Sequence, residues 1–273
     1  MDPSIWTGMY GEFSLPEALR ILSDCGWRRF EISSEHLVSI EKSNDPDSLI
    51  EKAQACICAH GLSTPQAHAL LDANVASADP KRRAQDVRRL LHHIEIAARF
   101  SVKTLVIHPG GYDPPLDTGR DDIPGFNVAA FRILGDAAAK HGIRIGLENL
   151  PSPGVSTARE MISLLQLIDH PAIGVTLDTS HANMCSLSSA RMVRELGEHL
   201  IATHISDNDG SGDQHLTPGG GTIDWVGLMK AFRNIGYEGI INLEIPGERH
   251  EIPEFRRLKT RFALEVAECL VGL

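Results

Sequence analysis

The sequence predicts an α/β protein that forms a single (β/α)8 barrel of the TIM-barrel type over residues 1–273. Three observations lead to this prediction. The length of 273 residues matches the roughly 250 residues that such a barrel needs. Short apolar runs alternate with longer amphipathic ones, as in repeated βα units. No linker or low-complexity tract divides the chain, so we expect one domain with its active site at the carboxyl ends of the strands.

Eight short apolar runs are the expected strands. They are Ser4–Met9, Arg29–Ser33, Ser63–Ala69, Thr104–His108, Arg144–Glu148, Ile173–Asp178, Ile201–Ser206 and Ile240–Ile245. The amphipathic stretches between and after them are the expected helices: Leu15–Cys25, Pro46–His60, Pro80–Phe100, Gly125–His141, Thr157–Asp169, Ser186–Glu198, Asp224–Ile235 and Pro253–Leu270. Asp45 and Asp79 each precede a proline at an expected helix start, as N-cap residues do. Glycines follow four expected helices as C-caps: Gly26, Gly61, Gly142 and Gly236.

Composition describes a globular protein without a membrane span. Hydrophobic residues make up 42% and charged residues 23% of the chain. No run of about 18 apolar residues is present, and the N-terminal residues lack the basic and apolar regions of a secretion signal. Five cysteines without a CxxC pair indicate reduced thiols. We therefore expect a cytoplasmic protein.

The charge balance bears on the class of partner. With 26 Lys and Arg against 36 Asp and Glu, the formal net charge is −10. Neutralising phosphates requires a basic face. The charge therefore argues against a nucleic-acid partner.

Six consecutive strands end in a residue that can bind a metal or move a proton. These residues are His68, His108, Glu148, Asp178, His204 and Glu244, and His181 follows shortly after Asp178. Successive members of the six lie 26 to 40 residues apart, about one βα unit. Because all the strand ends meet at one mouth of the barrel, the pattern indicates a shared site.

The most economical metal site uses four of these residues: Glu148, Asp178, His204 and Glu244. Three carboxylates and one imidazole favour Mn²⁺, Mg²⁺ or Co²⁺, and Zn²⁺ also fits. Two open positions on one such ion would hold neighbouring oxygens of a hydroxy-ketone. Glu148 and Glu244 would then remove and return a proton at carbon, while the metal stabilises the enediolate between the two steps.

Several motifs resemble the xylose-isomerase-like barrel superfamily, which includes sugar isomerases and epimerases and the endonuclease IV group. The motifs are LENLP, LDTSHANM, HISDN, GDQHLTPGGGTIDW and LEIPG. The resemblance runs from about His68 to Glu244 and implies that the same four residues bind the metal. In the epimerase branch it also implies proton transfer by the two glutamates and contact of His181 with the substrate.

The endonuclease IV branch raises the number of metals that the resemblance implies. That branch holds three zinc ions with nine residues, and the matching positions here are all suitable: His68, His108, Glu148, Asp178, His181, His204, Asp213, His215 and Glu244. Asp213 and His215 would either contact substrate in a one-metal sugar enzyme or hold a further zinc. The opening IWTGMYGEF departs from the endonuclease pattern, and the acidic charge disfavours DNA, so we favour the former.

Three further groups have local interpretations. Asp207 and Asp209 precede glycine in a loop, which is typical of turn hydrogen bonding. Asp224 is expected to cap the helix that follows it. Trp6, at the first strand end, would either floor a sugar pocket or pack under a loop.

The expected function is that of a divalent-metal-dependent isomerase or epimerase of a ketose, keto-sugar or related polyol in carbohydrate metabolism. One divalent ion is expected as cofactor, with up to three zinc ions in the endonuclease-like alternative. The expected partner is a small sugar, not nucleic acid or membrane, and a homo-oligomer would be in keeping with the family. A keto-sugar or inosose-type dehydratase using the same site is one alternative. A trinuclear zinc AP endonuclease is the other.

Overall fold

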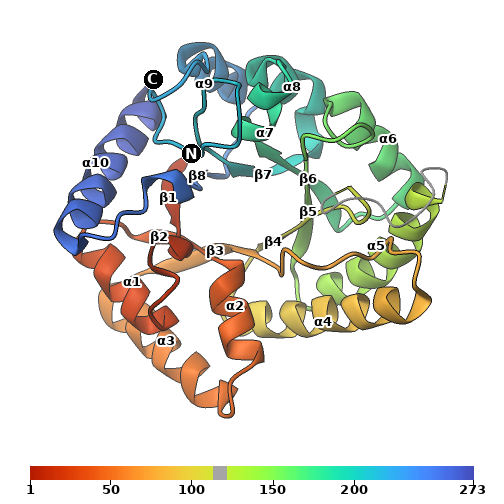
Figure 1. The fold of residues 1–273 in the computed structure, drawn as a ribbon, viewed down its shortest axis with the longest axis horizontal. Coiled ribbons are helices and arrows are strands. Elements are labelled where there is room, and N and C mark those ends of the chain that lie inside the picture. The colour runs from red at the N-terminus through yellow and green to blue at the C-terminus, as the bar shows by residue number, and fades with distance from the viewer. Residues whose placement is uncertain (113–121) are drawn as a thin grey trace.

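Eight parallel strands form a barrel at the centre of the computed structural model, which describes residues 1–112 and 122–273 (Figure 1). The strands are β1 (Asp2–Trp6), β2 (Arg29–Ile32), β3 (Ser63–His68), β4 (Thr104–Ile107), β5 (Arg144–Glu148), β6 (Ile173–Asp178), β7 (Leu200–His204) and β8 (Ile240–Leu243). They pair in the order β7-β6-β5-β4-β3-β2-β1-β8. The ring closes where Ile205 bridges Leu243 and its N–H donates to the carbonyl of Asn242 at 2.8 Å. The predicted (β/α)8 barrel is therefore confirmed.

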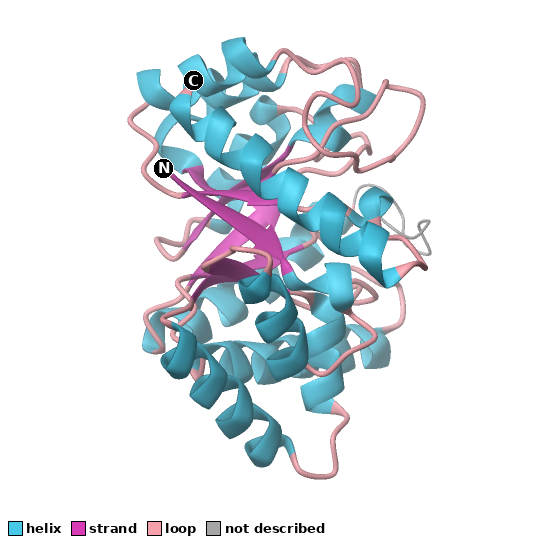
Figure 2. Ribbon diagram, turned by 90° about the vertical axis from the view of Figure 1, so that its left-hand side faces the viewer, coloured by secondary structure: helices cyan, strands magenta, loops and turns pink. Residues whose placement is uncertain are grey.

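Helices surround the strands on the outside (Figures 1 and 2). They are α1 (Leu15–Asp24), α2 (Ser34–Glu41), α3 (Pro46–His60), α4 (Pro80–Ala98), α5 (Ile123–Lys140), α6 (Ala158–Ile168), α7 (Thr179–Met184), α8 (Ser189–Leu196), α9 (Trp225–Asn234) and α10 (Pro253–Gly272). Short 3-10 helices are η1 (Thr7–Tyr10), η2 (Gly197–His199) and η3 (Pro246–Glu248). Each of the eight predicted helices is present, with ends that differ by at most a few residues.

The sequence analysis missed α2 and α7 and extended the first strand too far. The chain turns into η1 at Thr7, where the side-chain Oγ1 accepts from the backbone N–H of Ser33 at 2.9 Å. Helix α7 starts immediately after β6 because Asp178 accepts the N–H of His181 at 2.7 Å. These contacts lie at strand ends, where apolar periodicity gives no signal.

Helix caps follow the prediction. Asp45 accepts from the N–H of Ser48 at 3.1 Å, and Asp79 accepts from the N–H of Lys81 at 2.9 Å. The glycines that follow four helices all have positive φ, a conformation that costs glycine little: Gly26, Gly61, Gly142 and Gly236. The helix boundaries were therefore encoded by local chemistry.

The core lies between the strands and the helices. Its largest fully buried side chains include Trp27, Phe30, Phe131 and Phe232. Each of the five cysteines is a free thiol, as predicted. Within residues 1–112 and 122–273, no helix combines the length and apolar character needed to cross a membrane.

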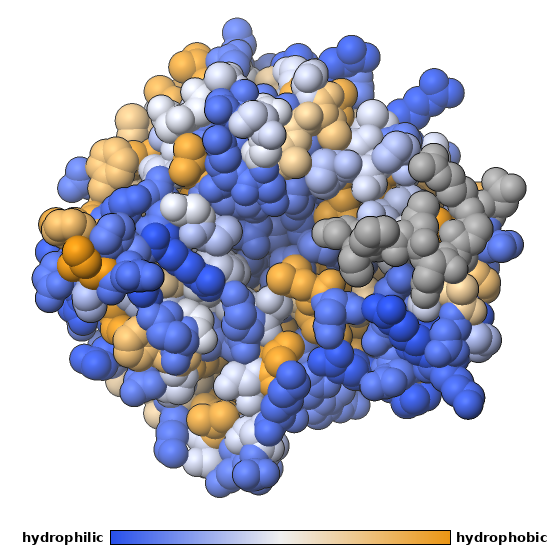
Figure 3. Space-filling model, in the orientation of Figure 1, coloured by the Kyte–Doolittle hydropathy of each residue, from blue (hydrophilic) through white to orange (hydrophobic). Residues whose placement is uncertain are grey.

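The carboxyl ends of the strands open on the face turned toward the viewer in Figure 1. In the same orientation, the surface of the molecule is hollowed near its centre, and the hollow is lined largely by hydrophilic residues (Figure 3). The parallel sheet thus brings the polar residues that end its strands to one place.

Candidate metal and active site

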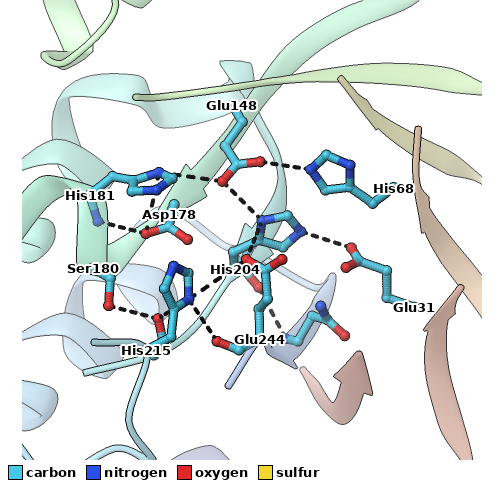
Figure 4. A network of polar contacts seen from close by, with 12 residues as sticks. Glu31, His68, Glu148, Asp178, Ser180, His181, His204, His215 and Glu244 are labelled. Atoms are coloured by element: carbon cyan, nitrogen blue, oxygen red, sulfur yellow. Dashed lines mark hydrogen bonds and ion pairs between the residues drawn. The ribbon is translucent and has the colours of Figure 1, made fainter. Parts of the chain in front are cut away.

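Four strand ends bring together the residues that the sequence analysis selected as metal ligands. Glu148, Asp178 and His204 are the last residues of β5, β6 and β7, and Glu244 directly follows β8. One ligand atom from each of the four lies within 4.8 Å of the others, and the side chains point toward one another (Figure 4). The four come from consecutive positions around the barrel, although 96 residues separate the first from the last.

Strand register and backbone clamps hold these four in place. Asp178 is paired with His204 across β6 and β7. Asn149 follows Glu148, and its side chain accepts from the N–H of Asp178 at 2.8 Å and donates to the carbonyl of Asp178 at 3.1 Å. The N–H of Glu244 donates to the carbonyl of Ile205 at 3.1 Å. These hydrogen bonds fix the backbone positions from which the side chains of Asp178 and Glu244 extend.

The imidazole of His204 is the centre of the cluster. It is completely buried, and its Nε2 donates to Oε2 of Glu31 at 2.8 Å. Its Nδ1 lies 3.1 Å from Oε1 of Glu148 and 3.2 Å from Oε2 of Glu244. Neither contact is a hydrogen bond, and in the described part of the chain both His204 Nδ1 and Asp178 Oδ2 are buried without a hydrogen-bond partner. Buried nitrogen and oxygen atoms that converge without hydrogen-bond partners are suited to coordinate a divalent cation through their lone pairs.

Electrostatics distinguish the two glutamates when no cation is bound. Burial favours the neutral form of Glu148, but His204 and His108 outweigh it and hold its pKa well below the ordinary value. Burial dominates at Glu244 and raises its pKa. Burial also opposes the charged form of His204, yet Glu148, Glu244 and Glu31 raise the pKa of its imidazole well above the ordinary value. A buried positive charge is therefore favoured at this point of the barrel.

A second group of possible ligands adjoins the first. Asp178, His181 and His215 also offer atoms within 4.8 Å of one another. Oδ2 of Asp213 lies 3.5 Å from Nε2 of His181, and Oδ1 lies 2.8 Å from Nε2 of His215. The Nδ1 of His181 donates to the carbonyl of Asn149 at 2.9 Å. Asp213 thus bridges two imidazoles at the mouth of the site.

His68 and His108 approach the second carboxylate oxygen of Glu148, the one that His204 does not contact. Their Nε2 atoms lie 3.2 Å and 3.3 Å from Oε2 of Glu148. His68, Glu148 and His204 form a third group of possible ligands. All nine residues that the endonuclease resemblance named therefore lie in one connected network.

Sequence reasoning missed Glu31 and its neighbour Gln66. Glu31 lies within β2, between apolar residues in the run RFEI, and is completely buried. The available signal was a carboxylate inside a strand expected to be buried. The residues that the sequence analysis selected lie at strand ends or in the segments that follow them, whereas Glu31 lies inside a strand.

Trp6 lies at the end of β1 and is 6% exposed. A Cβ atom at Gly8 would fall 2.0 Å from the Trp6 ring, so the indole packs directly on that glycine. The guanidinium of Arg249 lies over the ring at 4.6 Å from its centroid. These contacts match the packing interpretation of Trp6.

Asp207 organises the loop after β7, mainly through residues 12 to 18 positions farther along the chain and not through the turn hydrogen bonds that the sequence predicts. Oδ2 of this buried residue accepts from the N–H of Gly219 and the indole N–H of Trp225, each at 2.9 Å. Oδ1 accepts from the N–H groups of Asn208 at 3.0 Å and Ile223 at 3.3 Å. Asp209 bonds within its own turn, to the N–H of Ser211 at 2.9 Å. Asp224 caps α9 through the N–H of Gly227, as predicted.

A family model covers most of this barrel. The model for the xylose isomerase-like TIM barrel matches residues 19–264. The chain belongs to this family. The match includes the four strand-end residues of the central cluster and the loop that carries Asp213 and His215.

Of three similar proteins, two have names that refer to sugar epimerases. An uncharacterized protein of Methanocaldococcus jannaschii, MJ1311, is 32% identical over 195 residues, which cover 69% of this chain and 66% of that protein. A ketose 3-epimerase of Arthrobacter globiformis is 23% identical over 265 residues, covering 93% of this chain and 85% of that enzyme. The crystal structure of a D-tagatose 3-epimerase-like protein is 25% identical, with a TM-score of 0.82 over 100% of this chain and 98% of its own.

Replacing Asp207 with alanine should destabilise the loop after β7. The substitution leaves four donors without their acceptor, so we expect the free energy of unfolding to fall by about 2–3 kcal/mol. Urea unfolding measures this, and the fluorescence of Trp225, which loses its indole partner, reports the local change. Asp209→Ala in the same loop is the control, with an expected loss below about 1 kcal/mol. Equal losses in the two variants would contradict the central role of Asp207.

The ion pair of Asp213 and His215 should make the free energy of unfolding of the cation-free protein depend on pH. Burial lowers the pKa of His215, but Asp213 and neighbouring carboxylates outweigh it and raise the pKa from 6.5 to about 10. The stabilisation contributed by protonated His215 is fully present below pH 6.5. It is lost as the pH rises through about 10, because the imidazole then loses its proton in the folded protein as well. Unfolding in urea with a chelator, repeated across this range, should show Asp213→Asn with a shallower decline than the wild-type protein. An unchanged decline, or the same change in Asp209→Asn, would refute the assignment.

Proposed function

We propose that this chain is a divalent-metal-dependent isomerase or epimerase that acts on a ketose, a keto-sugar or a related polyol. The observation that carries the proposal is the cluster of Glu148, Asp178, His204 and Glu244, in which two glutamates flank a possible cation site. Membership of the family and the names of its ketose-epimerase relatives support the same conclusion.

The four residues would hold one divalent ion through carboxylate oxygens and His204 Nδ1. This set is rich in oxygen and suits Mn²⁺, Mg²⁺ or Co²⁺. When bound, the ion supplies positive charge that opposes the negative charge developing on substrate oxygens during proton abstraction. It would also relieve the repulsion among buried carboxylates.

Proton transfer is assigned to Glu148 and Glu244. Their side chains come from β5 and the end of β8, and one oxygen of each carboxylate lies 3.1 or 3.2 Å from the same atom, His204 Nδ1. One carboxylate takes a proton from the carbon next to the carbonyl group of the substrate. The other returns a proton to the intermediate, and for an epimerase it does so on the opposite face.

Substrate positioning is assigned to His181, Asp213 and His215. These side chains form the bridged group beside the cluster, and Asp213 is 42% exposed at the mouth. Imidazole N–H groups and a carboxylate can bind sugar hydroxyl groups as donors and acceptors. Such contacts would orient the carbon chain over the two glutamates.

Hydrogen exchange tests this function directly. With Mn²⁺ and a panel of ketohexoses in deuterated water, proton NMR should show metal-dependent exchange at the carbon next to the carbonyl. Glu148→Gln and Glu244→Gln should each slow the exchange by at least about 100-fold, whereas Glu248→Gln, which lies in η3 and is bonded to Lys259, should not. Exchange accompanied by loss of water would identify a dehydratase. No metal-dependent exchange with any ketose would count against the proposal.

A second candidate is a zinc phosphodiesterase of the AP endonuclease kind. Three overlapping groups of possible ligands favour it: the central cluster, the Asp178–His181–His215 group and the His68–Glu148–His204 group. Elemental analysis of the purified chain separates the candidates. The leading proposal expects one divalent ion per chain, whereas about three zinc ions with cleavage of abasic DNA would replace it with the second.

A further inference from the structure

Glu31 lies inside the barrel, directly behind the proposed metal ligands. It belongs to β2, three strands away from β7 and His204 around the closed barrel, and its side chain is completely buried. Its Oε2 accepts the hydrogen bond from Nε2 of His204 at 2.8 Å (Figure 4). No other described residue of the site offers an acceptor to this nitrogen.

A second buried side chain fixes the position of Glu31. The amide of Gln66, in β3, donates to Oε2 of Glu31 and to the carbonyl of Thr203 at 3.2 Å. Thr203 immediately precedes His204 in the chain. The carboxylate is therefore held between β2, β3 and β7, at a fixed place relative to the imidazole.

This contact decides which nitrogen of His204 faces the site. Because a carboxylate accepts hydrogen bonds, Nε2 carries the hydrogen and Nδ1 is left toward the oxygens of Glu148 and Glu244. The ring of His68 stacks on that of His204, with centroids 5.4 Å apart and planes 20° apart. Stacking and the Glu31 hydrogen bond together resist rotation of the imidazole.

We propose that Glu31 is a positioning residue for metal binding: it orients His204 and strengthens Nδ1 as a ligand. A carboxylate bonded to the outer nitrogen of a ligating imidazole fixes the tautomer and raises its basicity. Loss of such a partner weakens metal binding about 10- to 100-fold. The inference rests on the proposed metal site and adds a residue that would not itself touch the ion.

Binding of Mn²⁺ to the full-length, chelator-treated protein tests the inference. In Glu31→Gln, the side chain keeps its size and one acceptor oxygen but loses its charge, and calorimetry should show the Kd for Mn²⁺ raised about 10- to 100-fold. The visible absorption bands of bound Co²⁺ should also shift, because the geometry of His204 changes. A role confined to stability would lower the thermal midpoint of the metal-free protein and leave both readouts unchanged.

Glu41→Gln is the matched control. Glu41 ends α2, accepts from the guanidinium of Arg89 at 2.9 Å and faces Nε2 of the buried His93 at 3.5 Å. It is thus another carboxylate beside an imidazole, outside the site. We expect this variant to bind Mn²⁺ within about 3-fold of the wild-type protein and to leave the Co²⁺ bands in place.

Two outcomes would overturn the inference, and they are distinguishable. If the wild-type protein binds Mn²⁺ and Glu31→Gln binds it within about 3-fold, the positioning role fails and the proposed function stands. If the wild-type protein binds neither Mn²⁺ nor Co²⁺, the proposed function fails together with this inference. Should Glu31→Gln not fold, Glu31→Asp, which withdraws the carboxylate by one methylene, replaces it with the same expected direction and the same refuting result.

Discussion

The convergence of three carboxylates on one buried imidazole is the constraint on which the rest of the site depends. Glu31, Glu148 and Glu244 each approach His204 within 3.2 Å, and their negative charges are shielded little by water. Grouping such charges in a barrel interior is costly unless positive charge balances them. Without a cation, a proton on His204 supplies that balance, which is why the pKa of the imidazole is raised. The same charge pattern supports the proposal that a divalent ion binds here.

Parallel strands make this concentration of charge possible. Their hydrogen bonds fix the register of β5, β6 and β7 independently of the side chains they carry. Burial of the apolar residues around the strands supplies most of the stability of the fold. Polar groups can therefore lie at the barrel mouth even though they lower the stability there. Loops then supply side chains that no strand provides. Asp207 gives the loop after β7 a rigid base, from which Asp213 and His215 reach the second group.

The network also explains why a family resemblance alone leaves the number of metals open. Asp178 belongs to two possible ligand groups, and Glu148 and His204 also belong to two. The same side chains can serve one ion with polar neighbours or several ions that share ligands. The choice depends on how the imidazoles are oriented and protonated, and hydrogen bonds such as those of Asp213 and Glu31 set these properties.

The sequence by itself determined the barrel, the order of its elements, several helix caps and the polar residues that meet at the strand ends, because these depend on local periodicity and on a known edge of a parallel sheet. It missed the early end of β1 and the start of α2, where Thr7 accepts from the N–H of Ser33, 26 residues away in the sequence. It likewise missed α7, whose local cap on Asp178 follows β6 without an intervening loop. It also missed Glu31, which is 173 residues away from His204 along the chain. Only the closing of the sheet into a ring lets the side chain of Glu31 in β2 reach His204 in β7 across the barrel interior. Tertiary structure therefore decided which nitrogen of His204 faces the site.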